Sequence, residues 1–199
     1  MTTPTARVTS AEPTAFDACG FRVADVLRDG TRILIRACAA GDRDRMIRAF
    51  QCLERETIYS RFFAFKESLS EAELDFVAGF DFIDDVMLIA TIGDDETVIG
   101  AGSYNVRREV DERRVAEVAF VVEEDYQGLG IARRLLGHLA RIARERAVVQ
   151  FDAEVLARNR PMLRVFGASG FPMIRRTDGE TVHVSLQLMP GIGAFGVDH

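Results

Sequence analysis

A single glutamate interrupts an apolar run near the middle of the chain, and its setting suggests chemistry. Glu117 lies in the segment 115–122, next to Val118 and close to Phe120. On a strand its side chain would share a face with Val121. Apolar neighbours desolvate a carboxylate and raise its pKa, which suits a general base working near neutral pH. The alternative is an edge-strand glutamate that faces water.

A turn with two glycines follows this run, and a helical pattern begins directly after it. The turn has the sequence Gln-Gly-Leu-Gly-Ile-Ala at 127–132. The first turn of a helix exposes unpaired N–H groups and the positive end of the helix dipole. Gly128 and Gly130 would let the backbone approach a phosphate closely. The turn therefore predicts a phosphate cradle, with a tight turn that binds nothing as the alternative.

Neither common nucleotide-binding motif accounts for this turn. A dinucleotide fingerprint would need glycine at position 133, where Arg133 stands, and a P-loop would need a Gly-Lys-Ser/Thr ending, which the chain lacks. The cradle is thus expected to be of another kind.

The elements around the turn predict one parallel step in a sheet. Residues 131–146 read as a helix whose apolar face carries Ile131, Leu135, Leu139 and Ile142, with arginines on the other side. The strand-like run 147–156 can lie parallel to the run before the turn, because a crossover helix joins them. The two strands are therefore expected to be parallel neighbours in the sheet.

The remaining patterns favour antiparallel strands. Asp29-Gly30 and Asp178-Gly179 are hairpin turn signals. Further strands are expected around the polar turn at 93–95. The fold class is therefore mixed α/β, with a mostly antiparallel sheet and one parallel βαβ step.

Helices are expected elsewhere from capping signals. Asp42 is a suitable N-cap for a helix that continues into the aromatic segment 57–65. Ser70 and Glu73 have the spacing of a capping box. A shorter helix follows Asn159 and ends at Gly170.

Whole-chain properties narrow the class of protein. The 199 residues carry a net charge of −6, which argues against general nucleic-acid binding. The three cysteines form no pair typical of a disulfide framework or a zinc site, and the histidines have no ligand partner at metal spacing, so no metal is expected. No apolar run is long enough for a membrane span. We expect a cytoplasmic protein with a flexible arm (1–20), a single domain (21–190) and an irregular tail (191–199).

Two segments resemble a known family. The 127–132 turn matches the Gln/Arg-x-x-Gly-x-Gly/Ala signature of the GNAT N-acyltransferase superfamily, and 159–171 resembles that family's Asn-x-x-Ala-x-x-Leu-Tyr-x-x-x-Gly-Phe segment. The segments 32–63 and 116–136 look more narrowly like the GNAT domain of bacterial Pat-type protein lysine acetyltransferases. The resemblance implies the GNAT fold and acetyl-CoA as cosubstrate.

The resemblance also implies roles for single residues. The backbone amides of the turn would hold the pyrophosphate, and these residues are Gln127, Gly128, Leu129, Gly130, Ile131 and Ala132. Arg133 would meet a CoA phosphate, unless it is merely solvated. The parallel strands, one ending at Val122 and one at 148–156, would splay apart to admit the thioester. Val121 and Val122 would pair with the pantetheine amides, and Glu117 would be the general base. Asn159 would hydrogen-bond the cofactor arm, with a helix N-cap as the alternative role.

One departure from the family concerns the leaving thiolate. Phe166 stands where the family often has a tyrosine that can protonate the thiolate. Phe166 would still pack against pantetheine, but it has no proton to donate. The thiolate would then leave unprotonated, or another group such as Tyr126 or Tyr104 would serve.

The resemblance implies transfer of acetyl from acetyl-CoA to a protein lysine ε-amine by direct attack in a ternary complex, with a protein such as an acyl-CoA synthetase as acceptor. A small-molecule amine acetyltransferase and a non-catalytic acyl-CoA sensor are the alternatives. The aromatic residues Phe62, Phe63 and Phe65 could shape an acceptor groove or belong to the core. The sequence does not distinguish acyl chain lengths, or a monomer from a homodimer.

Overall fold

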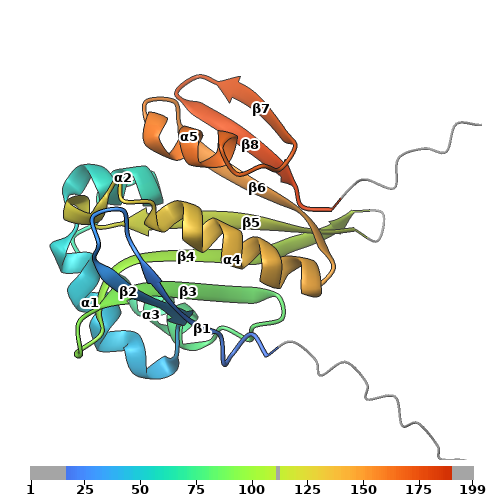
Figure 1. Ribbon diagram of the computed structural model, residues 1–199. Coiled ribbons are helices and arrows are strands. Elements are labelled where there is room, and N and C mark those ends of the chain that lie inside the picture. The colour runs from blue at the N-terminus through green and yellow to red at the C-terminus, as the bar shows by residue number, and fades with distance from the viewer. Residues whose placement is uncertain (1–16, 111–112, 190–199) are drawn as a thin grey trace, which may run out of the picture.

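The computed structural model describes residues 17–110 and 113–189 (Figure 1). The expected tail at 191–199 and most of the expected arm, residues 1–16, lie outside the described residues. Ala18 is 1% exposed and packs in the core. All three cysteines are free, with Cys38 buried. No described helix is long and apolar enough to cross a membrane.

One sheet of eight strands organises the described part of the chain, in the order β1-β2-β3-β4-β5-β6-β8-β7. Every neighbouring pair is antiparallel except β5 and β6, which are parallel. This confirms the mixed α/β fold class. The strands are β1 Arg22–Val26, β2 Arg32–Ala37, β3 Asp85–Ile92, β4 Thr97–Val110, β5 Arg113–Val122, β6 Val148–Leu156, β7 Met173–Asp178 and β8 Thr181–Gln187.

Five α-helices and two short 3-10 helices flank the described sheet. The α-helices are α1 Arg43–Cys52, α2 Arg55–Phe62, α3 Glu71–Ala78, α4 Ile131–Glu145 and α5 Arg160–Gly167, and the 3-10 helices are Ala40–Asp42 and Glu124–Tyr126. Helix α4 is the crossover between β5 and β6 and lies across one face of the sheet, whereas α1 and α2 contact β4 and β5 (Figure 1).

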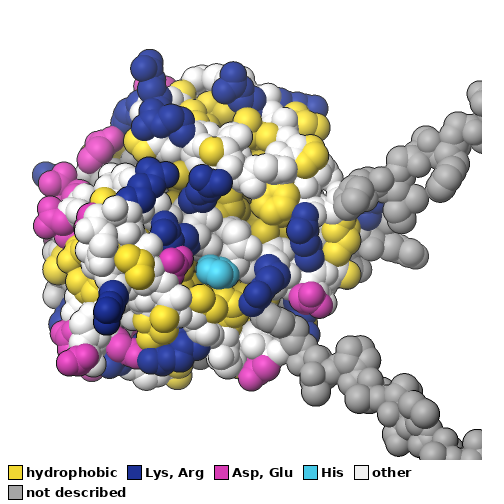
Figure 2. All heavy atoms as spheres, viewed as in Figure 1, with side chains coloured by type: hydrophobic (Ala, Val, Ile, Leu, Met, Phe, Trp, Pro, Cys, Tyr) yellow, Lys and Arg dark blue, Asp and Glu magenta, His cyan; other side chains and the backbone are white. Residues whose placement is uncertain are grey.

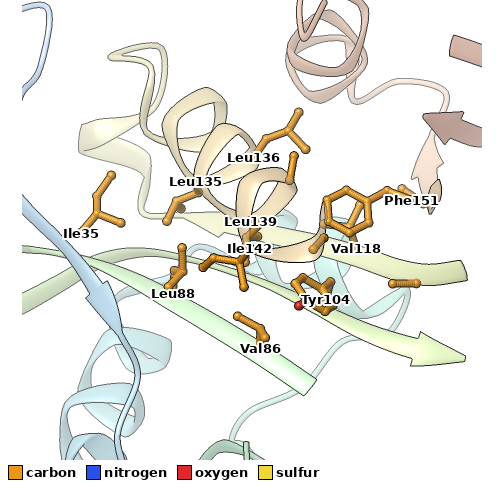
Figure 3. Packing of buried hydrophobic residues seen from close by; sticks show 14 of the residues in the cluster. Ile35, Val86, Leu88, Tyr104, Val118, Leu135, Leu136, Leu139, Ile142 and Phe151 are labelled. Atoms are coloured by element: carbon orange, nitrogen blue, oxygen red, sulfur yellow. The ribbon is translucent and has the colours of Figure 1, made fainter. Parts of the chain in front are cut away.

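The core lies between α4 and the sheet. The predicted apolar stripe of α4 is almost fully buried, at 1% exposure or less for Ile131, Leu135, Leu139 and Ile142. Figure 3 shows Leu135, Leu139 and Ile142 of α4 above Val86 and Leu88, with Val118 and Phe151 to one side of them. Burying a side chain of this size contributes about 1.5–3 kcal/mol, so α4 is held firmly against the face formed by β3, β4, β5 and β6.

Two capping predictions had different outcomes. The Ser70–Glu73 capping box is confirmed, since Ser70 N donates to Glu73 Oε2 at 2.8 Å and Glu73 N donates to Ser70 Oγ at 3.3 Å. Asp42 is the N-cap residue of α1, as predicted, but its side chain makes no capping hydrogen bond to this helix. Its carboxylate instead accepts hydrogen bonds from Arg36 at 2.6 and 2.7 Å and from Ala39 N at 2.9 Å. Asp42 is 2% exposed, and a buried guanidinium needs such a partner.

Three helix boundaries also differ from the sequence prediction. The helix expected to continue from Asp42 into the aromatic segment is interrupted at Leu53, which has extended backbone angles, so α1 and α2 are separate. Helix α2 ends at Phe62, because Phe63 after it adopts φ +54°. Helix α5 ends at Gly167, and Gly170 at φ +85° lies in the turn beyond it.

Candidate active site

The parallel strands β5 and β6 diverge part-way along their length. They pair from Arg114 opposite Val148 to Glu117 opposite Asp152, and beyond that point the described strands share no further pairing. On its other side β5 stays paired with β4 as far as Val122. One backbone edge of residues 118–122 is therefore open toward β6, as the resemblance implied.

A cleft of about 810 Å³ occupies this divergence and extends over the start of α4. Its walls come from β5, β6, α2, α5 and the glycine turn. Of the residues predicted to bind the cofactor, all but Leu129 line it: Val121, Val122, Gln127, Gly128, Gly130, Ile131, Ala132, Arg133, Asn159 and Phe166. Leu129 instead packs against the hydrophobic core.

The glycine turn has the backbone that its sequence predicted. Gly128 and Gly130 have φ of +76° and +96°, values that L-residues rarely adopt. Gly130 is the N-cap position of α4, and no side chain caps this helix. Its first-turn N–H groups therefore remain for an anion in the cleft, where the helix dipole also favours negative charge.

Two arginines connect the turn to the β1–β2 hairpin. Arg134 Nε lies 2.6 Å from Asp25 Oδ2, and its other nitrogens donate to Val26 O at 2.7 Å and Gly130 O at 3.3 Å. Arg28 donates to Gly128 O at 3.4 Å and lines the cleft. Sequence reasoning placed Arg134 on a polar helix face and missed both roles, because the partners are about a hundred residues away along the chain.

Gln127 braces the end of β5. Its side-chain amide donates to Val122 O at 3.1 Å and to Thr57 Oγ1 at 3.3 Å. It thereby joins the strand, the turn and α2. The Gln127 side chain is engaged in holding the cleft's shape, which leaves its backbone to face a ligand.

Glu117 lines the cleft, but its surroundings differ from those expected. Its side chain is 50% exposed and its Oε2 lies 2.9 Å from Arg107 Nε. The expectation that apolar neighbours desolvate it is wrong. Strand alternation sends Val118 to the opposite, core-facing side, and the residues beside Glu117 on its own face are Asn105 and Asp152.

Arg61 of α2 also faces the site, and the sequence carried no signal for it. It lines the cleft and interacts electrostatically with Glu117 and Glu73. Burial lowers the pKa of the Arg61 guanidinium, and these two carboxylates offset part of that shift. The glutamate at the cleft therefore has a positive charge on two sides, Arg107 and Arg61.

Comparison with known proteins shows which family has this fold and sequence. The sequence profile of the acetyltransferase (GNAT) family matches residues 52–171. The chain belongs to this family. Acetyltransferase Pat of Mycolicibacterium smegmatis is 31% identical over 153 residues, which are 77% of this chain and 45% of Pat. Acetyltransferase PA5475 of Pseudomonas aeruginosa is 30% identical over 155 residues, 78% of this chain and 83% of that protein.

A solved structure agrees with this assignment. The crystal structure of the GNAT domain of S. lividans PAT superposes with a TM-score of 0.76 at 33% identity, covering 83% of this chain and 96% of that domain. The resemblance inferred from the two motifs is thus confirmed. This chain is a member of the GNAT family homologous to Pat, and the matched region spans less than half of the M. smegmatis protein's length.

The α5 side of the GNAT cleft shows what Asn159 and Phe166 do. Asn159 Oδ1 accepts from Met162 N at 3.1 Å, so the N-cap role is present, and the same residue lines the cleft. Phe166 is 1% exposed, and its ring packs edge-on against Phe120 with 6.1 Å between the two ring centroids. Phe166 is therefore a fixed apolar wall of the cleft.

The two candidate tyrosines lie in different environments. Tyr104 is buried in the core beneath α4, at 1% exposure, and does not line the cleft (Figure 3). Burial raises the pKa of Tyr104 well above its usual value, and its hydroxyl has no hydrogen-bond partner among the described residues. Tyr104 is thus excluded as a proton donor to a thiolate in the cleft, whereas Tyr126 lines the cleft.

One ion pair joins opposite walls of the cleft. Arg158, in the loop between β6 and α5, lies 2.9 Å from Glu56 of α2, and its guanidinium is 5.2 Å from the Tyr59 ring. Both charged side chains are more than half exposed. Exposed pairs contribute about 0–1 kcal/mol, so this contact can open at little cost when a ligand enters.

No metal centre accompanies the cleft in the part of the chain that the structure describes. Within residues 17–110 and 113–189, no three His, Cys, Asp or Glu side chains are placed to hold an ion.

Proposed function

We propose that this GNAT acetyltransferase moves acetyl from acetyl-CoA to a lysine ε-amine of a protein, by direct attack in a ternary complex. The observation that carries the proposal is the divergence of β5 and β6, with an uncapped helix start at one end and Glu117 at the other. The similarity to Pat supports the protein acceptor.

The residues of the cleft fit the donor. The first-turn N–H groups of α4 suit the pyrophosphate, with Arg28 and Arg133 adding positive charge. The face around α4 displays many basic side chains, although the protein is acidic overall (Figure 2). The open edge at Val121 and Val122 can pair with the pantetheine amides as an added strand would.

The chemistry then follows from Glu117. A lysine ammonium has a reference pKa of about 10.4 and must lose a proton before its nitrogen can attack. Glu117 takes that proton, directly or through a water. The nitrogen attacks the thioester carbonyl, whose oxygen is polarised by N–H groups of the open β5 edge, and the C–S bond breaks.

The leaving group needs no dedicated proton donor in this scheme. Phe166 has no acidic proton, and Tyr104 lies in the core. A thiol with a reference pKa of about 8.5 is a good leaving group as its anion. We propose that CoA departs as the thiolate. Tyr126, which lines the cleft, is the alternative donor of a proton to the thiolate.

The acceptor side is open, which supports a macromolecular substrate. Glu117 is half-exposed, and polar residues adjoin it on the sheet face opposite α4. A lysine side chain presented by a folded protein such as an acyl-CoA synthetase can reach such a carboxylate. We place the reaction in the cytoplasm, because unpaired cysteines suit a reducing compartment.

Thiol release from acetyl-CoA tests the proposal, with an acyl-CoA synthetase as acceptor beside a panel of small amines. Glu117→Gln should lower turnover by about 10²–10⁴-fold. Glu180→Gln, in the exposed β7–β8 turn, is the matched control and should retain wild-type activity.

Three outcomes would contradict parts of the proposal. Turnover on small amines alone would exclude the protein acceptor. CoA binding without turnover on any amine would identify a sensor. Wild-type activity in Glu117→Gln would remove Glu117 from the mechanism.

A further inference from the structure

A second cavity lies on the sheet face opposite α4, beneath α1, α2 and α3. We call it the apolar chamber and define it by Met46, Ala49, Phe50, Met87, Ala101 and Val121. Its volume is about 260 Å³. A cavity of only about 10–15 Å³ holds a single water, and close-packed protein interiors have few voids even that large. A space of this size is therefore a candidate binding site.

The apolar chamber adjoins the cleft. Arg61, Phe62 and Val121 line both cavities. Val121 belongs to the open edge of β5, where the donor's pantetheine arm is proposed to pair. A group attached to the thioester carbonyl would therefore lie close to this shared wall.

The charges around the chamber favour a neutral occupant. Arg61 presents a guanidinium at the shared wall, which would repel an ammonium. Glu73 is already engaged by Lys66 and by Ser70. Glu123 is the third charged residue of the lining, and burial together with Asp125 and Glu124 raises the pKa of its carboxyl group, which favours its neutral form. The rest of the lining is almost entirely apolar, so hydrocarbon is the chemistry that the chamber would bind best.

We propose that the apolar chamber receives the acyl chain of donors longer than acetyl, such as butyryl-CoA or hexanoyl-CoA. The inference rests on the proposed acyl-CoA site and extends it to acyl chain length. The reaction keeps the same balance: the amide C–N bond forms, the thioester C–S bond breaks, and the amine proton goes to the base.

Calorimetric titration without any acceptor tests the proposal, using CoA, acetyl-CoA, butyryl-CoA and hexanoyl-CoA. Each methylene that enters the chamber should tighten binding about fourfold. Because no amine is present, the result does not depend on which acceptor the enzyme uses.

Filling the chamber should abolish this gain. Ala49→Leu extends a side chain into the chamber from α1, and Ser103→Val fills it from β4. Both variants should bind acetyl-CoA like the wild type, which also shows that they fold, and lose about 10-fold or more in affinity for butyryl-CoA. Gln51→Leu, an exposed position on α1, is the control and should keep the full gain.

Failure of the chamber proposal can be distinguished from failure of the proposed function. Equal affinity for all acyl-CoAs in the wild type would overturn the chamber's role but leave the proposed function standing. Absence of CoA binding would overturn both. Equal affinities combined with weaker acceptor turnover in Ala49→Leu would assign the chamber to the acceptor instead.

Discussion

Gly130 is required for two separate reasons at the start of α4, and replacing it by alanine tests both. Its φ is +96°, and a Cβ there would lie 2.7 Å from Arg134 Nη1. The positive φ is a property of the turn alone. The lack of room for a Cβ depends on Arg134, whose side chain is held by Asp25 and Val26 of the hairpin.

The two contributions can be estimated separately. An L-residue in the left-handed region costs about 1–2 kcal/mol. Moving Arg134 weakens its partly exposed ion pair with Asp25 and its backbone hydrogen bonds, which adds about 1 kcal/mol. Gly130→Ala should therefore lower the free energy of unfolding by about 2–3 kcal/mol, a fall in Tm of about 4–12 °C.

The chain offers matched controls for each contribution. Gly128 has φ +76°, but a Cβ at this position would meet nothing within 4 Å, so Gly128→Ala should show the backbone cost alone, about 1–2 kcal/mol. Gly137 lies inside α4 with no positive φ and open space around it, so Gly137→Ala should stabilise by about 0.5–1 kcal/mol. Urea denaturation of the three variants measures all three values.

A double variant decides whether the contact argument is correct. In an Arg134→Met background, Gly130→Ala should lose its extra cost and match Gly128→Ala. Equal destabilisation by Gly128→Ala and Gly130→Ala in the wild-type background would refute the role given to Arg134. Both turn variants should also bind CoA more weakly, since their N–H groups form the proposed phosphate cradle.

Three further predictions concern charged groups. Asp42→Ala should destabilise by about 3–5 kcal/mol in urea denaturation, because it removes the main partner of buried Arg36. Burial raises the pKa of Asp42, but hydrogen bonds from Arg36 and Ala39 outweigh burial and hold the pKa in the folded protein below 3.8. The stability that ionised Asp42 contributes is therefore present above pH 3.8 and is lost as the pH falls through the pKa of Asp42 in the folded protein. Burial and Arg141 lower the pKa of His138 below 6.5, so the wild type should lose stability as the pH falls below 6.5. The His138→Gln variant should lack that part of the loss when its free energy of unfolding is compared at pH 5 and pH 8. Arg158→Ala should change stability by less than about 1 kcal/mol, and a loss above about 2 kcal/mol would show that the cross-cleft pair is structural.

Local sequence signals predicted much of this molecule correctly. The Asp29-Gly30 and Asp178-Gly179 hairpins, the Ser70–Glu73 capping box and the apolar stripe of α4 each depend on residues a few positions apart. The glycine turn and the parallel step followed from the same kind of signal. Each involves steric or hydrogen-bonding preferences that act within one or two turns of the chain, so reading the sequence was sufficient.

The environments of charged side chains could not be predicted in this way. Asp42 has the spacing of a helix cap, yet Arg36 takes its carboxylate because that guanidinium is buried. Arg134 reads as a solvated helix residue until the β1–β2 hairpin brings Asp25 to it. The aromatic helix α2 supplied Arg61 to the cleft without any motif.

By itself the sequence determined the mixed α/β fold, the parallel step through α4, the glycine turn before that helix and membership of the GNAT family, because these rest on local patterns. Only the tertiary structure decided that Glu117 is half-exposed and paired with Arg107, that Tyr104 is buried in the core away from the cleft, and that a second cavity adjoins the cleft. Solvation and electrostatics depend on which residues surround a group in space, and those residues come from strands and helices far apart along the chain.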